Sequence, residues 1–169
     1  METPSSSATG TAGLTRDAGW QIGVRRTIPV SPEAIWDVLL SDEGRAVWLG
    51  AGAEIPNRLE AAYRATDGTT GDVRSYAPRR LIRLTWWPVG WDAPSTLQIR
   101  IQPAARGTTL SVHQEHLASA ERRSGMRDRW VTVIDRLVGL PLERVARQLP
   151  ACGQTPSPVL SQLTGSLSR

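Results

Sequence analysis

Two histidines, His113 and His116, lie three residues apart in the segment TTLSVHQEHL and are the only histidines in the chain. The segment alternates apolar and polar residues, which is typical of a β-strand whose successive side chains point to opposite faces. A spacing of three therefore directs the two rings apart and argues against a shared metal ion. We expect His116 to face inward with Gln114, where a polar group could orient a ligand. The alternative is a hydrogen-bonded histidine at the end of a strand.

Other catalytic arrangements are not indicated. The acidic residues of the same region form no pair at a spacing that would suggest two cooperating carboxylates. The chain has no Gly-x-Ser-x-Gly elbow, no phosphate-binding glycine loop and no dinucleotide fingerprint. Its single cysteine, Cys152, excludes an intrachain disulfide and a cysteine-rich zinc site. The sequence therefore predicts no catalytic residue, metal or cofactor.

Three tryptophans fall within six positions in the stretch RLTWWPVGWDAPS, residues 83–95. Alternation puts Trp86 on the apolar face of a strand and Trp87 on the other face. Pro88 removes a hydrogen-bond donor and ends the strand, and Trp91 returns apolar surface toward it. A tryptophan ring combines a large apolar area with one N–H donor. We interpret the stretch as the rim of a pocket. The alternative is a small cluster of apolar side chains that holds the loop in place.

Composition restricts the class of protein. The chain has 169 residues, 40% of them hydrophobic, and a formal charge of +4, with arginine as its only basic residue apart from histidine. The arginines are spread along the chain rather than gathered on one element, which disfavours a nucleic-acid partner. No stretch approaches the ~18 apolar residues of a membrane-spanning helix. The N-terminus lacks the basic and apolar regions of a secretory signal, so we expect a cytoplasmic protein.

The periodicity predicts an α+β domain at residues 19–149, between a disordered tail at 1–18 and a flexible tail at 150–169. A first strand precedes a helix that Ser31 caps and that begins at Pro32; Gly44 closes this helix or separates it from a second turn. A long C-terminal helix ends near Gly139. The strands are expected at residues 20–28, 58–65, 71–77, 80–87, 95–103 and 108–117.

Four segments in this order resemble the START-related (SRPBCC) superfamily. The similarity is greatest to bacterial homologues of the C-terminal domain of the heat-shock chaperone ATPase activator. These segments are IPVSPEAIWDVLLSDEGRAVWL (28–49), the step from Gly71 to Pro78 that RLIRLTW follows, GTTLSV (107–112) and RWVTVIDRL (129–137). The resemblance implies a helix-grip fold, in which a curved antiparallel sheet of about six strands packs on the long C-terminal helix with a cavity between them.

The resemblance implies a binding protein for a small apolar or aromatic molecule. The residues expected to line the cavity are Tyr63, Trp86, Ile99, Val112, Gln114, His116, Met126 and Trp130. Two alternatives remain: a polyketide cyclase or dehydratase with His116 as general acid or base, and a module that binds a protein partner. Only about nineteen residues precede the first predicted strand. From this we expect the second docking domain of the chaperone-binding branch to be absent.

Overall fold

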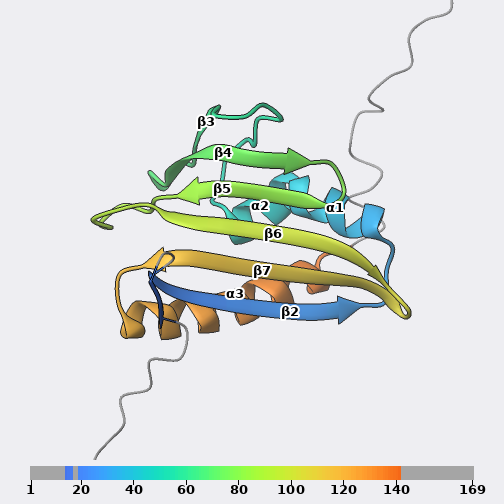
Figure 1. Ribbon diagram of the computed structural model, residues 1–169. Coiled ribbons are helices and arrows are strands. Elements are labelled where there is room, and N and C mark those ends of the chain that lie inside the picture. Colours follow the sequence, from blue (N-terminus) through green and yellow to red (C-terminus); the bar gives the residue numbers. More distant parts are fainter. Residues whose placement is uncertain (1–13, 17–18, 142–169) are drawn as a thin grey trace, which may run out of the picture.

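The computed structural model describes residues 14–16 and 19–141. Within these ranges seven antiparallel strands form one open sheet in the order β1-β2-β7-β6-β5-β4-β3, and three helices lie on one of its faces (Figure 1). The predicted α+β helix-grip architecture is confirmed. The strands are β1 (Leu14–Thr15), β2 (Gly19–Ile28), β3 (Ala62–Arg64), β4 (Thr70–Ala77), β5 (Leu81–Trp86), β6 (Ser95–Ala104) and β7 (Gly107–Leu117). The helices are α1 (Pro32–Leu40), α2 (Asp42–Trp48) and α3 (Ala120–Gly139).

The core lies between the inner face of the sheet and the helices. Figure 1 shows α3 running behind β2 and β7, with α1 and α2 behind the neighbouring strands. Alternate residues of β5, β6 and β7 are buried, as strands with one covered face require. The helix α3 contributes one apolar stripe at spacings of three and four. The buried residues of this stripe are Met126, Trp130, Val133, Ile134 and Leu137.

The two early helices are separated at Ser41, not at Gly44 as the sequence indicates. The Ser41 hydroxyl accepts the Gly44 N–H at 2.9 Å and so caps α2, while the Ser41 N–H closes α1. Gly44 lies inside α2, where a Cβ atom would stand 1.7 Å from the carbonyl oxygen of Val38. The glycine is therefore explained by a close approach between consecutive helices rather than by a helix end.

The predicted strand at 58–65 is wrong in its first half. Glu60 adopts a left-handed conformation with φ of 59°, and the Ala61 N–H bonds the Arg58 carbonyl in a turn. Leu59 is consequently 61% exposed instead of facing the core. Only the short β3 remains at this edge of the sheet, and β1 adds a seventh strand at the other edge.

Several predictions concern residues that the structure does not describe. The tails at 1–18 and 150–169 fall outside the described residues, apart from the segment 14–16. The segment LERVARQL and Cys152 also lie outside them. The domain bounds at 19 and 149 therefore stay a prediction.

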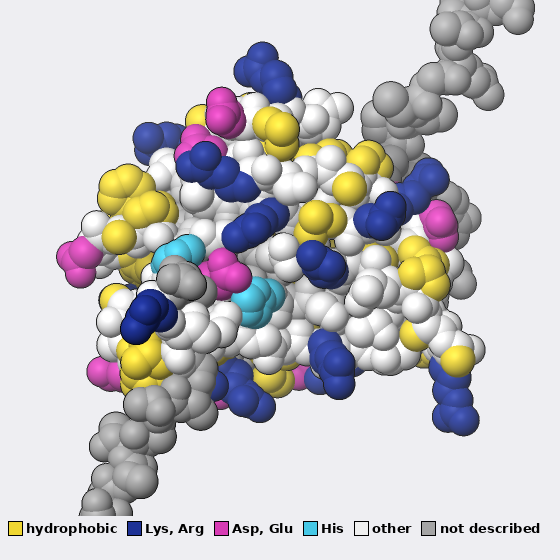
Figure 2. Space-filling view, in the orientation of Figure 1, with side chains coloured by type: hydrophobic (Ala, Val, Ile, Leu, Met, Phe, Trp, Pro, Cys, Tyr) yellow, Lys and Arg dark blue, Asp and Glu magenta, His cyan; other side chains and the backbone are white. Residues whose placement is uncertain are grey.

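The face of the sheet that the helices leave uncovered is polar. Figure 2 shows basic side chains spread over this face among uncharged polar groups, with histidine beside an acidic side chain. The Arg83 and Glu115 side chains form an ion pair here at 3.3 Å. None of the helices in the part of the chain that the structure describes has both the length and the apolar character that a membrane crossing requires.

The approach of α1 to α2 can be tested with Gly44→Ala. The added methyl group meets backbone that cannot move alone, so we expect the free energy of unfolding to fall by about 2–3 kcal/mol. Gly125→Ala is the matched control, because no atom lies within 4 Å of the Cβ it would add. This change in the interior of α3 should raise the free energy of unfolding by about 0.5–1 kcal/mol. Urea denaturation measures both, and equal effects would contradict the close approach.

Candidate ligand-binding site

A cavity of about 520 Å³ lies between the β5–β6 connection and the first turns of α3. We call it the Trp86 cavity. One wall is aromatic and comes from the sheet side, and the other comes from α3. The lining residues are Trp86, Pro88, Trp91, Ser119, Glu121, Arg122, Gly125 and Met126. This is the end of the fold at which the sequence predicts a pocket rim.

The aromatic wall is positioned by the way in which β5 ends. Trp86 is the last residue of β5 and is 5% exposed, whereas Trp87 points outward and is 45% exposed, as predicted. Gly90, with φ of 80°, lets the chain turn back. Trp91 then packs edge-on against Trp86, with their ring centroids 5.3 Å apart. The indole N–H of Trp87 donates to the Trp91 carbonyl at 2.7 Å and holds the loop.

The indole N–H of Trp86 is buried and has no acceptor among the described residues. An unpaired buried donor costs about 1–3 kcal/mol, so a position of this kind requires an explanation. Trp48 and Trp130, the two fully buried tryptophans, donate to the Leu39 carbonyl and the Gln114 side chain respectively, at 2.9 and 2.8 Å. Trp86 differs from them in that it lines a cavity. An acceptor on a bound molecule would complete its hydrogen bonding.

The helical wall is fixed by the N-terminus of α3. The Ser119 hydroxyl accepts the Arg122 N–H at 3.1 Å and caps the helix. Arg122 places its guanidinium 4.5 Å from the ring centroid of Trp91, and Arg129 places its own 5.3 Å from that of Trp86. Burial lowers the pKa of Arg129, and the charge of Asp67 opposes this effect. The guanidinium groups therefore lie against the aromatic wall.

Gln114 is buried as predicted, but its contacts are structural. Its side-chain N–H₂ group donates to the Ser95 hydroxyl at 2.8 Å, and its oxygen accepts the Trp130 indole N–H at 2.8 Å. Ser95 in turn donates to the Trp86 carbonyl at 3.1 Å. Gln114 does not line the Trp86 cavity. Its amide joins β6, β7 and α3 instead.

The prediction that His116 faces inward is wrong. The pairing of β2 with β7 shifts by one residue between Ile22–Gln114 and Trp20–Leu117. His116 lies in this bulge with φ of 62°, and its side chain is exposed. Its Nδ1 atom is 3.2 Å from the Thr96 hydroxyl on the outer face. One extra residue in a strand reverses the direction of the side chains that follow, and simple alternation cannot reveal it.

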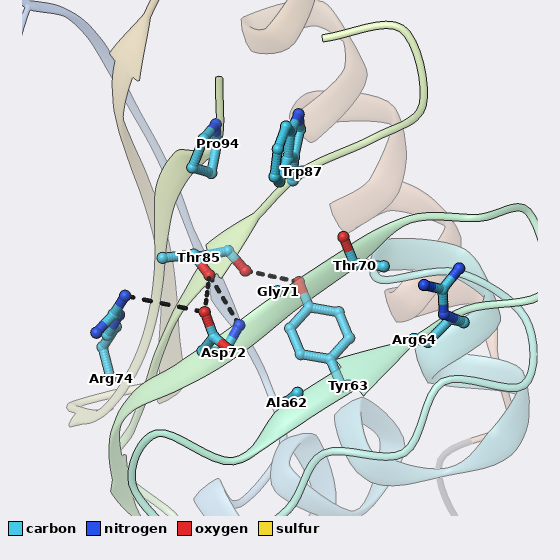
Figure 3. A pocket seen from close by; sticks show the side chains of 10 residues that line it. All are labelled: Ala62, Tyr63, Arg64, Thr70, Gly71, Asp72, Arg74, Thr85, Trp87 and Pro94. Atoms are coloured by element: carbon cyan, nitrogen blue, oxygen red, sulfur yellow. Dashed lines mark hydrogen bonds and ion pairs between the residues drawn. The ribbon is translucent and has the colours of Figure 1, made fainter. Parts of the chain in front are cut away.

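Tyr63 joins three strands rather than lining the Trp86 cavity. Its hydroxyl donates to the Thr85 carbonyl at 2.7 Å, while the Asp72 N–H donates to the Thr85 hydroxyl at 2.7 Å (Figure 3). Its ring crosses Gly71, where a Cβ atom would lie 2.7 Å from the ring. Burial, and then the charge of Asp72, raise the pKa of Tyr63. The phenol therefore stays protonated and acts as a hydrogen-bond donor within the sheet.

Tyr63 borders a second cavity of about 530 Å³ on the outer side of the β3–β4–β5 edge. Figure 3 shows Trp87 and Pro94 together at one end of it and the paired Asp72 and Arg74 further along. The Asp72 and Arg74 side chains are 3.8 Å apart. The polar side chains of Asp72, Arg74 and Thr85 bond one another in this cavity. We therefore interpret it as a consequence of how the strands pair rather than as a binding site.

Of the predicted ligand-binding residues, the structure brings Trp86 and Met126 together at the Trp86 cavity. Ile99, Val112 and Trp130 are buried in the core and do not line it. Sequence reasoning missed Arg122 and Glu121. A signal for Arg122 was present, because it stands one helical turn before Met126 and residues four apart share a face. Within the described residues no cluster of potential metal ligands occurs.

Comparison with known proteins identifies a family. The family model described as Activator of Hsp90 ATPase homolog 1-like protein matches residues 29–140. No curated protein matches the chain.

Solved structures share the fold at low sequence identity. Protein MLL2253 from Mesorhizobium loti is 22% identical with a TM-score of 0.61, covering 73% of this chain and 97% of that one. DynU16, from the dynemicin biosynthetic locus, is 20% identical with a TM-score of 0.61; 70% of this chain matches only 46% of that one. The Aha1 dimer from Colwellia psychrerythraea is 14% identical with a TM-score of 0.56, covering 69% of this chain and 92% of that one. Identities this low establish the fold alone.

The structural role of Gln114 can be tested with Gln114→Leu. The change leaves the buried Trp130 N–H without its acceptor, so we expect the free energy of unfolding to fall by about 1–3 kcal/mol. Gln98→Leu is the matched control, since Gln98 is a half-buried residue on the outer face of β6. Chemical denaturation measures both variants. A Gln114→Leu protein as stable as the control would show that the amide does not hold the core together.

Proposed function

This chain belongs to the Activator of Hsp90 ATPase homolog 1-like family, and from that premise we propose that it binds a small apolar or aromatic molecule in the Trp86 cavity. The observation that carries the proposal is that Trp86, which lines this cavity, has a buried indole N–H with no acceptor among the described residues. A ligand with one acceptor oxygen would pair this donor while its rings contact Trp91 and Met126.

The dimensions and the wall of the cavity support this proposal. Sites for small molecules usually enclose about 300–1,000 Å³ and combine apolar walls with a few polar groups. The Trp86 cavity, at about 520 Å³, lies within that range. Its wall contains two tryptophans, a methionine and a proline, with polar side chains gathered at the start of α3.

Binding without catalysis is favoured over a cyclase activity. A general acid or base must lie within hydrogen-bond reach of the reacting group. His116, the residue that the resemblance offers for this role, faces away from the cavity on the outer side of the sheet. The titratable residues that line the cavity are Glu121 and Arg122, and both side chains are exposed. The arrangement suits recognition of a ligand better than proton transfer.

Filling the cavity should abolish binding. The probe is prodan, an uncharged naphthalene ketone whose emission reports both polarity and hydrogen bonding. In Gly125→Leu the new side chain extends from a cavity-lining position with open space around it, so we expect affinity to fall by about tenfold or more. Gly139→Leu, at the far end of the same helix and equally open, is the control. Unchanged prodan binding in Gly125→Leu would place the ligand elsewhere.

Removing the indole N–H should weaken binding without removing the aromatic wall. Trp86→Phe keeps a buried ring but deletes the donor, so prodan affinity should fall by about fivefold, the value of one neutral hydrogen bond. The prodan emission in the complex should also shift to shorter wavelength, because its carbonyl would lose a donor. Trp36→Phe is the control, since Trp36 is a buried tryptophan on α1 that does not line the cavity. Equal losses in both variants would contradict the proposed anchor.

A further inference from the structure

We propose that the ligand of the Trp86 cavity is a small aromatic acid, and that Arg122 binds its carboxylate at the mouth of the cavity. This inference rests on the proposed function and adds the charge of the ligand to it. It assigns two anchors of different kinds. Both Trp86 and Arg122 line the cavity; the Trp86 indole N–H is buried and unpaired, and the Arg122 side chain is exposed.

The first argument is the balance of donors and acceptors. The polar side chains that line the cavity belong to Trp86, Ser119, Glu121 and Arg122. An indole N–H and a guanidinium can only donate hydrogen bonds. The Ser119 oxygen already accepts the Arg122 backbone N–H and leaves its own proton to donate. Donors therefore predominate, and a ligand rich in acceptor oxygens pairs with them.

The second argument is that the charge of Arg122 is available. Among the described residues no carboxylate forms an ion pair with Arg122. Its guanidinium is instead held 4.5 Å from the ring centroid of Trp91. Contact with an aromatic face leaves the N–H edges of the group free, and these edges match the two oxygens of a carboxylate. The side chain is thus positioned before a ligand arrives.

The third argument is the sign of the surrounding charge. The Arg129 guanidinium lies 5.3 Å from the ring centroid of Trp86, although Arg129 does not itself line the cavity and the charge of Asp67 acts on it. Glu121 is the one acidic residue among those that line the cavity, and it is exposed. Both guanidinium groups contact the tryptophan rings whereas the Glu121 carboxylate is solvated, so an anion is favoured over a cation of the same size beside the aromatic wall.

The test compares two ligands of the same shape, 1-naphthoate and 1-naphthamide, by titration calorimetry at neutral pH. The acid is ionised under these conditions and the amide is not. We expect 1-naphthoate to bind about tenfold more tightly, because a hydrogen bond between charged partners exceeds a neutral one by roughly that factor. Raising the salt concentration should reduce this preference, since the mouth of the cavity is open to solvent.

Single-residue variants test whether Arg122 causes the preference for 1-naphthoate over 1-naphthamide. Arg122→Gln should bring the two affinities together by weakening 1-naphthoate alone. Arg127→Gln is the matched control, because Arg127 is exposed on α3 and does not line the cavity. Glu121→Gln should act in the opposite direction and tighten 1-naphthoate binding. Thermal melts of each variant check that these surface changes leave the fold intact.

The outcomes separate this inference from the proposed function. If both ligands bind with equal affinity in the cavity, the function stands and the acidic ligand is excluded. If Arg127→Gln removes the preference as fully as Arg122→Gln, the effect belongs to net charge and the assignment of Arg122 is overturned. If neither ligand binds and prodan also fails to bind, the proposed function fails, and the inference fails with it.

Discussion

The hydrogen bonds of one buried amide determine how α3 lies against the sheet. Gln114 on β7 pairs with Ser95 on β6 and with the Trp130 indole on α3, and none of the three has access to water. Because unpaired polar groups are costly in the interior, these three side chains must meet in one geometry. Trp130, Met126 and Arg122 stand four residues apart along one side of α3. Fixing Trp130 to Gln114 therefore also sets where Met126 and Arg122 face the tryptophan loop.

The cavity lies between the end of β5 and the first turns of α3. Trp86 ends β5, Pro88 prevents the strand from continuing, and Trp91 packs against Trp86 while Arg122 of α3 lies 4.5 Å from the Trp91 ring centroid. The rings of Trp86 and Trp91 border this cavity. Trp86 belongs to both regions, since it is part of the hydrophobic core and also lines the cavity. The Trp86 indole N–H has no acceptor among the described residues, whereas the Trp130 indole N–H donates to Gln114.

Sequence periodicity predicted the faces of the sheet well where strands were regular. It placed Trp86 and Gln114 inward and Trp87 outward, because strict alternation leaves no other choice. It failed at His116, where a bulge inserts one residue, since a bulge depends on the partner strand β2 as well as on the local residues. It also read Gly44 as a helix end, because the close approach of α2 to the Val38 carbonyl is a tertiary contact. Arg122 was missed although its spacing from Met126 was a signal, because several arginines occur in the same helix and most of them are exposed.

The polar groups of the fold fall into two sets with different consequences for recognition. The interior set pairs within itself: Gln114 with Ser95 and Trp130, and the Tyr63 hydroxyl with the Thr85 carbonyl. These groups have little capacity left for a ligand, so they determine stability and geometry. The rim set, Trp86 and Arg122, keeps donors that no side-chain acceptor satisfies among the described residues. Under the proposed function, chemical selectivity resides at the rim, where β5 ends and α3 begins. Relatives with the same core can consequently differ in what they bind through changes in this loop and this first helical turn alone.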